Sequence, residues 1–213
     1  MLVKICGIRD AAALDAARQA GADMVGFVFF PPSPRAVTAN EAGMLARSYR
    51  DGPKRVGLFV DPDDAMLAAT LAEVPLDILQ LQGEESPARA GDIRARFGKP
   101  VMKALGIASK ADLAHLPEYA DQVDYFLLDA RPPPGSALPG GNAVAFDWAL
   151  MKGEKPPRPW LLAGGLTPAN VVQAITTSGA PGVDVSSGVE RTRGVKDPAA
   201  IAAFIAAAKS GRA

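Results

Sequence analysis

A lone cysteine and an aspartate stand where two apolar runs of the sequence end, and both side chains could do chemistry. Cys6 closes the run LVKIC, with Lys4 two residues before it, and Asp129 stands near the end of the run YFLLDA. A neighbouring ammonium favours the thiolate form of a cysteine, so Lys4 would make Cys6 more reactive. Each residue also has a structural interpretation, because a lone cysteine is often inert in a core and an aspartate after a strand often caps a turn.

Two segments that contain glycine predict a phosphate-binding site. They are LAGGLTPAN (162–170), which contains Gly164 and Gly165, and VDVSSGVE (183–190), which contains Ser187 and Gly188. Glycines let backbone N–H groups approach an anion closely, and a helix that begins at Thr167-Pro168 would add partial positive charge. The alternative is that the paired glycines only form a tight turn.

One cation and a set of interior polar side chains complete the candidates. Arg35, in the loop PPSPR (31–35), offers paired donors for a carboxylate or a phosphate, unless it is simply a solvated surface arginine. Residues of equal parity on a strand point to one side, so a column of polar residues is expected in one interior: Lys4, Cys6, Gln80, Gln82, Lys103, Asp129 and Asp184. Unpaired buried polar groups cost free energy, so these groups satisfy one another or a ligand. His115 lies away from the strand ends, and we interpret it as a surface histidine.

Composition narrows the class of protein. The 213 residues include 23 Lys and Arg against 23 Asp and Glu, with 48% hydrophobic and 22% charged residues. This balance provides no positive field for nucleic acid or an anionic membrane, so we expect a small-molecule partner. A single cysteine forms no internal disulfide, and with a single histidine it forms no usual zinc site. The absence of a membrane-spanning stretch and of a signal peptide predicts a cytoplasmic protein.

Strand-like and helix-like segments alternate along the chain. Runs rich in Val, Ile, Leu and Phe begin near residues 2, 23, 54, 77, 100, 124, 159 and 182. Helices are predicted at residues 10–20, 39–50, 62–73, 86–97, 109–116, 146–151, 168–177 and 197–208, of which the fifth and sixth are the weakest. Eight such units favour an α/β fold, a single (β/α)8 TIM barrel, over a doubly wound open sheet. No linker divides the chain, so residues 1–213 are expected to form one catalytic barrel domain.

Helix starts and loop lengths refine this prediction. Four pairs place a capping side chain before a proline, which marks a helix start: Asp61-Pro62, Ser86-Pro87, Thr167-Pro168 and Asp197-Pro198. The loops PPSPR (31–35) and RPPPGSALPGGNA (131–143) are long. In a barrel such loops lie at the carboxyl ends of the strands, so we expect them to bind substrate or to form a lid.

Seven segments resemble the phosphoribosylanthranilate isomerase family. They are KICGI (4–8), GADMVGFVFFPPSPR (21–35), RVGLFV (55–60), LLDA (127–130), GGNAVAFDW (140–148), LAGGLTPANV (162–171) and DVSSGVE (184–190). The first and the last are fairly specific to this family, whereas many phosphate-binding barrels share the glycine pair. The resemblance implies an aldose–ketose isomerase of tryptophan biosynthesis, an intramolecular oxidoreductase that carries out the Amadori rearrangement of N-(5-phosphoribosyl)anthranilate.

The resemblance also implies roles for individual residues. Cys6 would be the general base, Asp129 the general acid, and Arg35 the contact for the anthranilate carboxylate. The phosphate cradle would consist of Gly164, Gly165, Ser187 and Gly188, with Asp184 near the sugar. One acid and one base suffice for this chemistry, so no metal or cofactor is expected, provided that burial or substrate charge raises the pKa of Asp129. The partner is a phosphorylated small molecule, and the oligomeric state stays open, with a monomer slightly favoured.

Two residues depart from the family pattern. Gln82 stands where many members have histidine, and Ala143 follows Asn142 where a glycine is usual.

Two alternative functions also stay open. A histidine-pathway aminoaldose isomerase would resemble this chain but with a pair of aspartates, and Cys6 argues against it. A non-catalytic barrel that binds phosphorylated metabolites would have no need of both Cys6 and Asp129.

Overall fold

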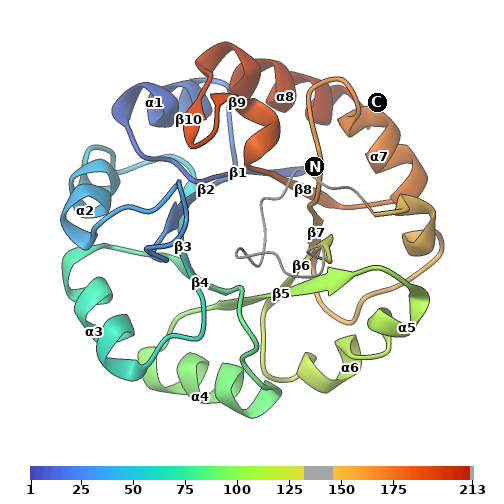
Figure 1. Ribbon diagram of the computed structural model, residues 1–213, viewed down its shortest axis with the longest axis horizontal. Helices are drawn as coiled ribbons and strands as arrows, with labels where there is room; N and C mark the ends of the chain where they lie inside the picture. The colour runs from blue at the N-terminus through green and yellow to red at the C-terminus, as the bar shows by residue number, and fades with distance from the viewer. Residues whose placement is uncertain (132–145, 212–213) are drawn as a thin grey trace.

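Eight parallel strands close into a barrel in the order of the sequence (Figure 1). The computed structural model describes residues 1–131 and 146–211. Each strand begins within one residue of its predicted start: β1 (Leu2–Cys6), β2 (Met24–Val28), β3 (Lys54–Phe59), β4 (Ile78–Leu81), β5 (Val101–Ile107), β6 (Tyr125–Ala130), β7 (Trp160–Leu162) and β8 (Gly182–Val185). The predicted (β/α)8 barrel is therefore confirmed, and the open sheet is wrong.

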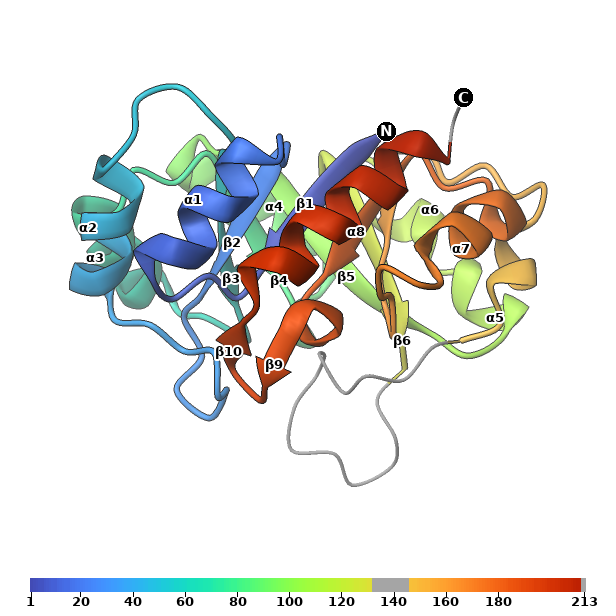
Figure 2. The ribbon, with the colours of Figure 1, turned by 90° about the horizontal axis from the view of Figure 1, so that it is seen from above.

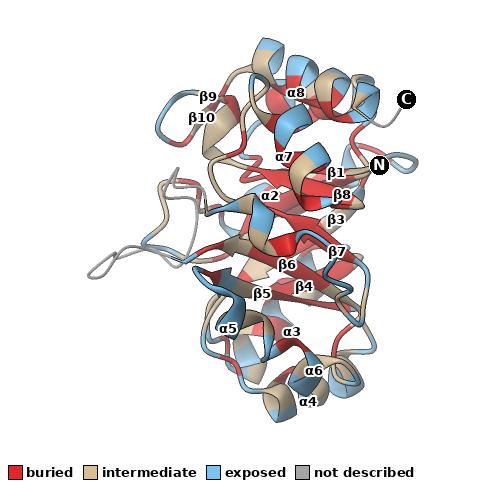
Figure 3. Ribbon diagram, turned by 90° about the vertical axis from the view of Figure 1, so that its right-hand side faces the viewer, coloured by how far each residue is buried: buried red, intermediate tan, exposed pale blue. Residues whose placement is uncertain are grey.

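The barrel closes between its first and last strands, and its inside contains a cluster of apolar side chains as well as the buried polar residues Lys4, Gln80 and Lys103. Lys4 of β1 is in register with Met24 of β2 on one side and with Asp184 of β8 on the other. The apolar cluster within the barrel consists of Met24, Val56, Ile78, Met102, Ala104, Leu127, Leu161 and Ala163. A larger apolar layer lies between the strands and the helices, and Figure 3 shows buried strands beneath helices whose outer faces are exposed. The interior is thus a packed core rather than a channel.

Helices cover the outside of the barrel. They are α1 (Ala11–Gln19), α2 (Ala39–Arg47), α3 (Asp64–Glu73), α4 (Pro87–Phe97), α5 (Lys110–Leu113), α6 (Leu116–Tyr119), α7 (Val171–Ser178) and α8 (Pro198–Ser210). The segment predicted at 109–116 is divided between α5 and α6, because Pro117 has no N–H to continue the hydrogen bonding of α5. The segment predicted at 146–151 is only the short 3-10 helix η1 (Trp148–Met151).

Two of the four predicted helix starts are confirmed. Ser86 caps α4 and Asp197 caps α8, each with its side chain accepting from a backbone N–H of the first turn. The start at Asp61-Pro62 is wrong, because Asp63 caps α3 by accepting a hydrogen bond from the backbone N–H of Met66 at 2.7 Å.

The start at Thr167-Pro168 is also wrong. Helix α7 begins at Val171, after Asn170, and Thr167 lies in the turn that precedes it. The backbone N–H of Thr167 donates to Asn170 Oδ1 at 2.7 Å, which closes that turn before the helix can begin. The partial positive charge of this helix end therefore lies further from the glycine pair than the sequence predicts.

A small antiparallel hairpin after β8 has no counterpart among the predicted elements. The 3-10 helix η2 (Ser187–Val189) leads into β9 (Glu190–Thr192), which pairs with β10 (Val195–Lys196). The turn of the hairpin packs against the loop after β2, since a Cβ at Gly194 would lie 2.5 Å from the carbonyl oxygen of Pro34. Figure 2 shows the hairpin beside that loop. Strands of three and two residues are too short for an alternating pattern to predict them.

Two expectations concern residues that the structure does not describe. Most of the long loop at 131–143 lies outside the described ranges, as do Asn142 and Ala143, so the lid and the effect of Ala143 stay predictions. In the part of the chain that is described, no helix has both the length and the apolar character needed to cross a membrane.

Candidate active site

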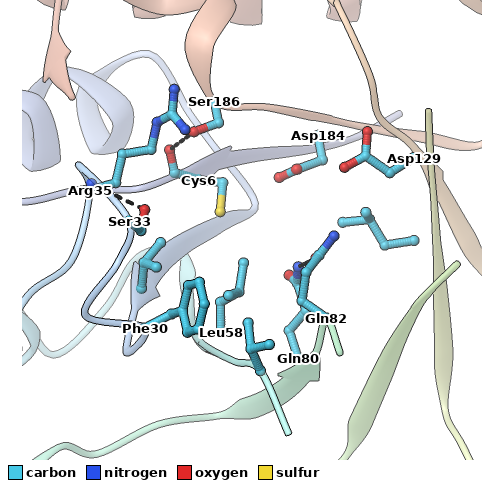
Figure 4. A pocket seen from close by; sticks show the side chains of 13 residues that line it. Cys6, Phe30, Ser33, Arg35, Leu58, Gln80, Gln82, Asp129, Asp184 and Ser186 are labelled. Atoms are coloured by element: carbon cyan, nitrogen blue, oxygen red, sulfur yellow. Dashed lines mark hydrogen bonds between the residues drawn. The ribbon is translucent and has the colours of Figure 1, made fainter. Parts of the chain in front are cut away.

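Four of the predicted site residues meet at one cavity at the mouth of the barrel (Figure 4). Cys6, Arg35, Asp129 and Asp184 all line this cavity, which we call the mouth cavity. The other lining residues are Val28, Phe30, Ser33, Leu58, Val60, Gln80, Gln82, Leu127 and Ser186. Because parallel strands of a barrel all end at the same face, residues far apart in the sequence meet there.

Cys6 is a buried thiol that borders the mouth cavity, with 4% of its surface exposed. Burial raises the pKa of this thiol and Asp184 raises it further, whereas Lys4 and Lys196 act in the opposite direction. The direction of the Lys4 effect agrees with the expectation that Lys4 favours the thiolate. The net pKa of Cys6 is nevertheless raised, because the loss of hydration outweighs the nearby ammonium groups.

Asp129 is a carboxyl with a strongly raised pKa. It is partly exposed to the mouth cavity, yet burial by the surrounding protein raises its pKa to about 7, and the charge of Asp184 adds to this increase. Its Oδ1 accepts a hydrogen bond from the backbone N–H of Ala130 at 2.8 Å. In Figure 4, Asp129 and Cys6 lie on opposite sides of Asp184. The cavity therefore has a carboxyl that can hold a proton near neutral pH on one side and a thiol on the other.

The predicted column of polar side chains contains two buried ion pairs. Lys4 Nζ lies 2.7 Å from Asp184 Oδ1, and Lys103 Nζ lies 2.7 Å from Glu85 Oε2. Both lysines are almost completely buried. These lysines are thus satisfied by carboxylates rather than left for a ligand, and Glu85 is a partner that the sequence did not single out.

Two glutamine amides form the third contact in the column. Gln80 Nε2 donates to Gln82 Oε1 at 2.7 Å, and both residues line the mouth cavity. Gln80 Oε1 has no hydrogen-bond partner among the residues that the structure describes. A buried acceptor of this kind can take a hydrogen bond from a bound hydroxyl. Gln82 thus occupies a place on the cavity wall where it can make hydrogen bonds but cannot transfer protons as an imidazole does.

Arg35 is held by a carboxylate of the hairpin. Its Nε lies 2.7 Å from Glu190 Oε1 and its Nη2 lies 3.1 Å from Glu190 Oε2, a forked pair of hydrogen bonds. Lys196 Nζ approaches the same carboxylate at 2.9 Å. Burial acts to raise the pKa of Glu190, but hydrogen bonds from Arg35 and the charge of Lys196 together lower it to about 2. These three side chains carry a net charge of about +1, which favours an anion beside Arg35.

The glycine-containing loops after β7 and β8 pack backbone against backbone. Gly164 and Gly165 have φ angles of +87° and +61°, which residues other than glycine rarely adopt. A Cβ at Gly188 would lie 1.8 Å from the carbonyl oxygen of Leu166, so the two loops touch at this point. Ser187 begins η2 beside this contact. The four residues predicted to hold phosphate therefore occupy adjoining loops, but they do not line the mouth cavity described above.

Several residues of the site are not predicted by any local pattern in the sequence. Glu190 and Lys196 belong to the hairpin, and Arg35 and Glu190 are 155 residues apart. Phe30 and Leu58 add an apolar wall to the cavity, although the sequence marks them only as part of apolar runs. Within residues 1–131 and 146–211, the side chains of His, Cys, Asp and Glu form no group that could hold a metal ion.

A (β/α)8 barrel with an acid, a thiol and a cation around one cavity at its carboxyl face has the architecture of a barrel enzyme. The model of the N-(5'phosphoribosyl)anthranilate (PRA) isomerase family matches residues 3–207 of this chain. The chain therefore belongs to the PRA isomerase family.

Relatives and solved structures agree with this membership. An N-(5'-phosphoribosyl)anthranilate isomerase of Paracoccus denitrificans is 58% identical over 97% of this chain and 96% of its own length. One from Rhodospirillum rubrum is 55% identical over 99% of this chain and 98% of its own length. The crystal structure of the phosphoribosyl anthranilate isomerase from Thermotoga maritima matches with a TM-score of 0.88 and 34% identity, covering 99% of each chain. A phosphoribosyl anthranilate isomerase in complex with reduced 1-(o-carboxyphenylamino)-1-deoxyribulose 5-phosphate also matches. Its TM-score is 0.85 and its identity is 34%, over 99% of this chain and 100% of that one.

Proposed function

We propose that this chain converts N-(5-phosphoribosyl)anthranilate into 1-(2-carboxyphenylamino)-1-deoxyribulose 5-phosphate in tryptophan biosynthesis. The observation that carries the proposal is the presence of the Cys6 thiol and of a carboxyl with a pKa of about 7, Asp129, on one cavity. Relatives that are 58% and 55% identical have the name of this isomerase. Within the isomerases we propose the class of intramolecular oxidoreductases, because one sugar carbon is oxidised while its neighbour is reduced.

One acid and one base can carry out every step of this reaction. Asp129 donates a proton to the ring oxygen, the bond from C1' to that oxygen breaks, and the nitrogen lone pair forms a Schiff base. The Cys6 thiolate then removes the proton from C2', and the released electron pair gives an enolamine. Tautomerisation places a proton on C1' and leaves a carbonyl at C2'. The oxidation and the reduction balance within one molecule, so we propose no cofactor.

The walls of the mouth cavity suit the parts of this substrate. Val28, Phe30 and Leu58 offer apolar surface to the aromatic ring. Arg35, in a cluster of net positive charge, suits the anthranilate carboxylate. Asp184 lines the cavity between the proposed acid and base, where we propose that it contacts the sugar.

The phosphate is proposed to bind at the loops after β7 and β8. Backbone N–H groups there can approach an anion closely, because Gly164, Gly165 and Gly188 have no side chains. Ser187 adds a hydroxyl donor. This is the role that we propose for these four residues.

Replacing Arg35 with alanine is expected to raise the KM for phosphoribosylanthranilate about tenfold or more, because a charged hydrogen bond contributes about 1.5–3 kcal/mol. The turnover number should change less, since Arg35 does not transfer a proton. Steady-state kinetics separate the two parameters. The matched control is the phosphoribosyl derivative of aniline, which lacks the carboxylate. Equal KM increases for both substrates would contradict the carboxylate contact.

Replacing Gly188 with alanine is expected to weaken phosphate binding, because the new Cβ cannot fit 1.8 Å from the carbonyl oxygen of Leu166 and the two loops must separate. We expect KM to rise at least about tenfold, as for the loss of one charged hydrogen bond. A suitable control is Gly211→Ala, where the added Cβ makes only a 3.4 Å contact with Val172. An unchanged KM in a folded Gly188→Ala variant would remove these loops from the proposed phosphate site.

Complementation tests the proposed function and its two alternatives together. The gene is expressed in one bacterial strain that lacks phosphoribosylanthranilate isomerase and in another that lacks the histidine-pathway aminoaldose isomerase. We expect growth without tryptophan in the first strain and no growth without histidine in the second. Rescue of the histidine auxotroph alone would favour the alternative isomerase. Failure in both strains by a folded protein would favour a barrel that only binds phosphorylated ligands.

Three further expectations belong to this proposal. We propose that residues 1–213 act as one catalytic domain, because the strands of the barrel form a single closed ring. We propose the cytoplasm as its location, since a charged phosphorylated substrate does not cross membranes freely. We also retain the proposal of a monomer, which sedimentation of the purified protein would test.

A further inference from the structure

Lys4 is a completely buried cation in the first strand of the barrel. It has 0% surface exposure, and its Nζ donates to Asp184 Oδ1 at 2.7 Å across the register of β1 with β8. Burial acts to lower the pKa of Lys4, but the carboxylate of Asp184 and the thiolate form of Cys6 raise it above its ordinary value. Lys4 therefore stays charged in the core. A buried charge is costly, so one that is retained beside a reactive group calls for an explanation.

The ammonium of Lys4 and the sulfur of Cys6 occupy the same small space. The two residues are separated by one position on β1 and therefore point to the same side of the strand. Gly26 lies opposite Cys6 on β2, and a Cβ there would lie 2.9 Å from Cys6 Sγ and 3.4 Å from Lys4 Nζ. In agreement with this placement, the charge of Lys4 acts to lower the pKa of Cys6, and the thiolate form of Cys6 acts to raise the pKa of Lys4. The glycine at position 26 thus leaves room for a contact between a cation and a sulfur atom.

We propose that Lys4 is a positioning residue that stabilises the thiolate of Cys6, and that Asp184 in turn holds the ammonium of Lys4 against that sulfur. No proton moves to or from Lys4. When the thiolate takes a proton, the favourable contact with Lys4 weakens, and it returns when the thiol ionises again. The catalytic relevance of this device rests on the proposed function of Cys6 as the base.

The other charged groups around Cys6 do not make the same contact. Asp184 on β8 opposes ionisation of the thiol. Lys196 on β10 favours it, but its Nζ is engaged by Glu190 at 2.9 Å and by the carbonyl oxygen of Ser186 at 2.8 Å. Asp129 on β6 and Arg35 line the same mouth cavity. Of these cations, Lys4 borders the space at Gly26 together with the sulfur of Cys6.

The single cysteine of the chain makes a direct test possible. Iodoacetamide alkylates the thiolate form, so its rate against pH reports the ionisation of Cys6 through the midpoint and its accessibility through the alkaline plateau. In Lys4→Met we expect the midpoint to move to higher pH and the rate at pH 7.5 to fall at least about tenfold, as expected for the loss of a close opposite charge. The plateau should stay within about twofold of the wild-type value. An unchanged midpoint in folded Lys4→Met would overturn the proposal.

Lys103→Met is the matched control. Lys103 is also a buried lysine with a carboxylate 2.7 Å away, but its Nζ donates to Glu85 and to the carbonyl oxygen of Gly83, and it is not among the groups that shift the pKa of Cys6. We expect its alkylation profile to match that of the wild type. An equal shift of the midpoint in both variants would show a general loss of core packing and would overturn the specific role of Lys4.

If Lys4→Met does not fold, Lys4→Gln replaces it in the same alkylation experiment. Its amide can still hydrogen-bond to Asp184 but has no charge. Lys4→Arg should recover part of the lost rate. The absence of a midpoint shift in folded Lys4→Gln would contradict the proposal as firmly as it would in Lys4→Met. Turnover of phosphoribosylanthranilate is then measured on the same variants. A shifted midpoint with unchanged turnover would keep the ionic contact and would instead contradict the function of Cys6 as the base.

Discussion

Replacing Cys6 with alanine is expected to lower the turnover of phosphoribosylanthranilate by about 10²- to 10⁴-fold, the usual contribution of a positioned proton-transfer group. The thiol borders the mouth cavity opposite the carboxyl of Asp129, so no other described group is proposed to take the proton from C2'. Initial rates at saturating substrate measure the loss. The fold should survive, because the substitution removes one sulfur atom from the wall of a cavity.

Cys6→Ser is the matched control for the loss of shape. Serine nearly preserves the size of the side chain, but its hydroxyl ionises far less readily than a thiol. We therefore expect the serine variant to be as impaired as the alanine variant, within about tenfold, since both lose the proton-transfer group. Turnover in either variant close to that of the wild type would remove Cys6 from the mechanism. A circular dichroism spectrum like that of the wild type excludes unfolding as the cause of any loss.

Replacing Asp129 with asparagine is the second large effect that we expect, again about 10²- to 10⁴-fold in turnover. Asparagine keeps the acceptor for the backbone N–H of Ala130, which lies 2.8 Å from Oδ1, but it has no proton to give to the ring oxygen. Opening of the sugar ring would then rely on water. Undiminished turnover in a folded Asp129→Asn variant would contradict its assignment as the acid.

The pH profile of the wild type gives a further test of the same pair. Asp129 has a pKa of about 7, and the pKa of Cys6 is raised above its ordinary value. As pH rises, Asp129 loses its proton before Cys6 does. The active form, in which Cys6 is a thiolate and Asp129 is still protonated, is therefore a small fraction of the molecules that have lost one proton. Activity should therefore rise through about pH 7 and fall only at the pKa of the thiol. In Asp129→Asn the rising limb near pH 7 should disappear, and a retained limb would contradict the assignment.

The Asp129→Asn substitution, which should lower turnover, should increase the free energy of unfolding. The pKa of Asp129 is 3.8 in its ordinary state and about 7 in the folded protein, so folding favours the protonated form. Its contribution to stability is complete below pH 4 and is lost as pH rises through 7, by up to about 4 kcal/mol. Asp129→Asn should therefore gain stability relative to the wild type between pH 4 and pH 8. Urea unfolding of both proteins at these two pH values measures this difference.

The sequence predicts the barrel well because each buried parallel strand is a short apolar run with clear ends. Cys6 and Asp129 stand at or near the ends of two such runs, so their place at the mouth follows from the fold. The parity of Lys4 and Asp184 also predicts that both face one interior. Their pairing does not follow, because it depends on how the first and last strands are staggered when the barrel closes.

Other features depend on long-range contacts that no local pattern encodes. Glu190 holds Arg35 from a hairpin too short for any periodic signal. The net state of the Cys6 thiol depends on its depth of burial, which a neighbouring lysine in the sequence cannot reveal. The start of α7 at Val171 shows a similar limit, since Asn170 closes a turn that the pair Thr167-Pro168 alone does not predict.

The most direct test of the central claim follows the fluorescence of anthranilate when the purified protein is added to freshly generated phosphoribosylanthranilate. We predict a rapid decay whose rate is proportional to protein concentration, with 1-(2-carboxyphenylamino)-1-deoxyribulose 5-phosphate as the product. Cys6→Ala and Asp129→Asn should decay at nearly the spontaneous rate. A folded wild-type protein that gives no decay above the spontaneous rate would contradict the claim that this chain is a phosphoribosylanthranilate isomerase.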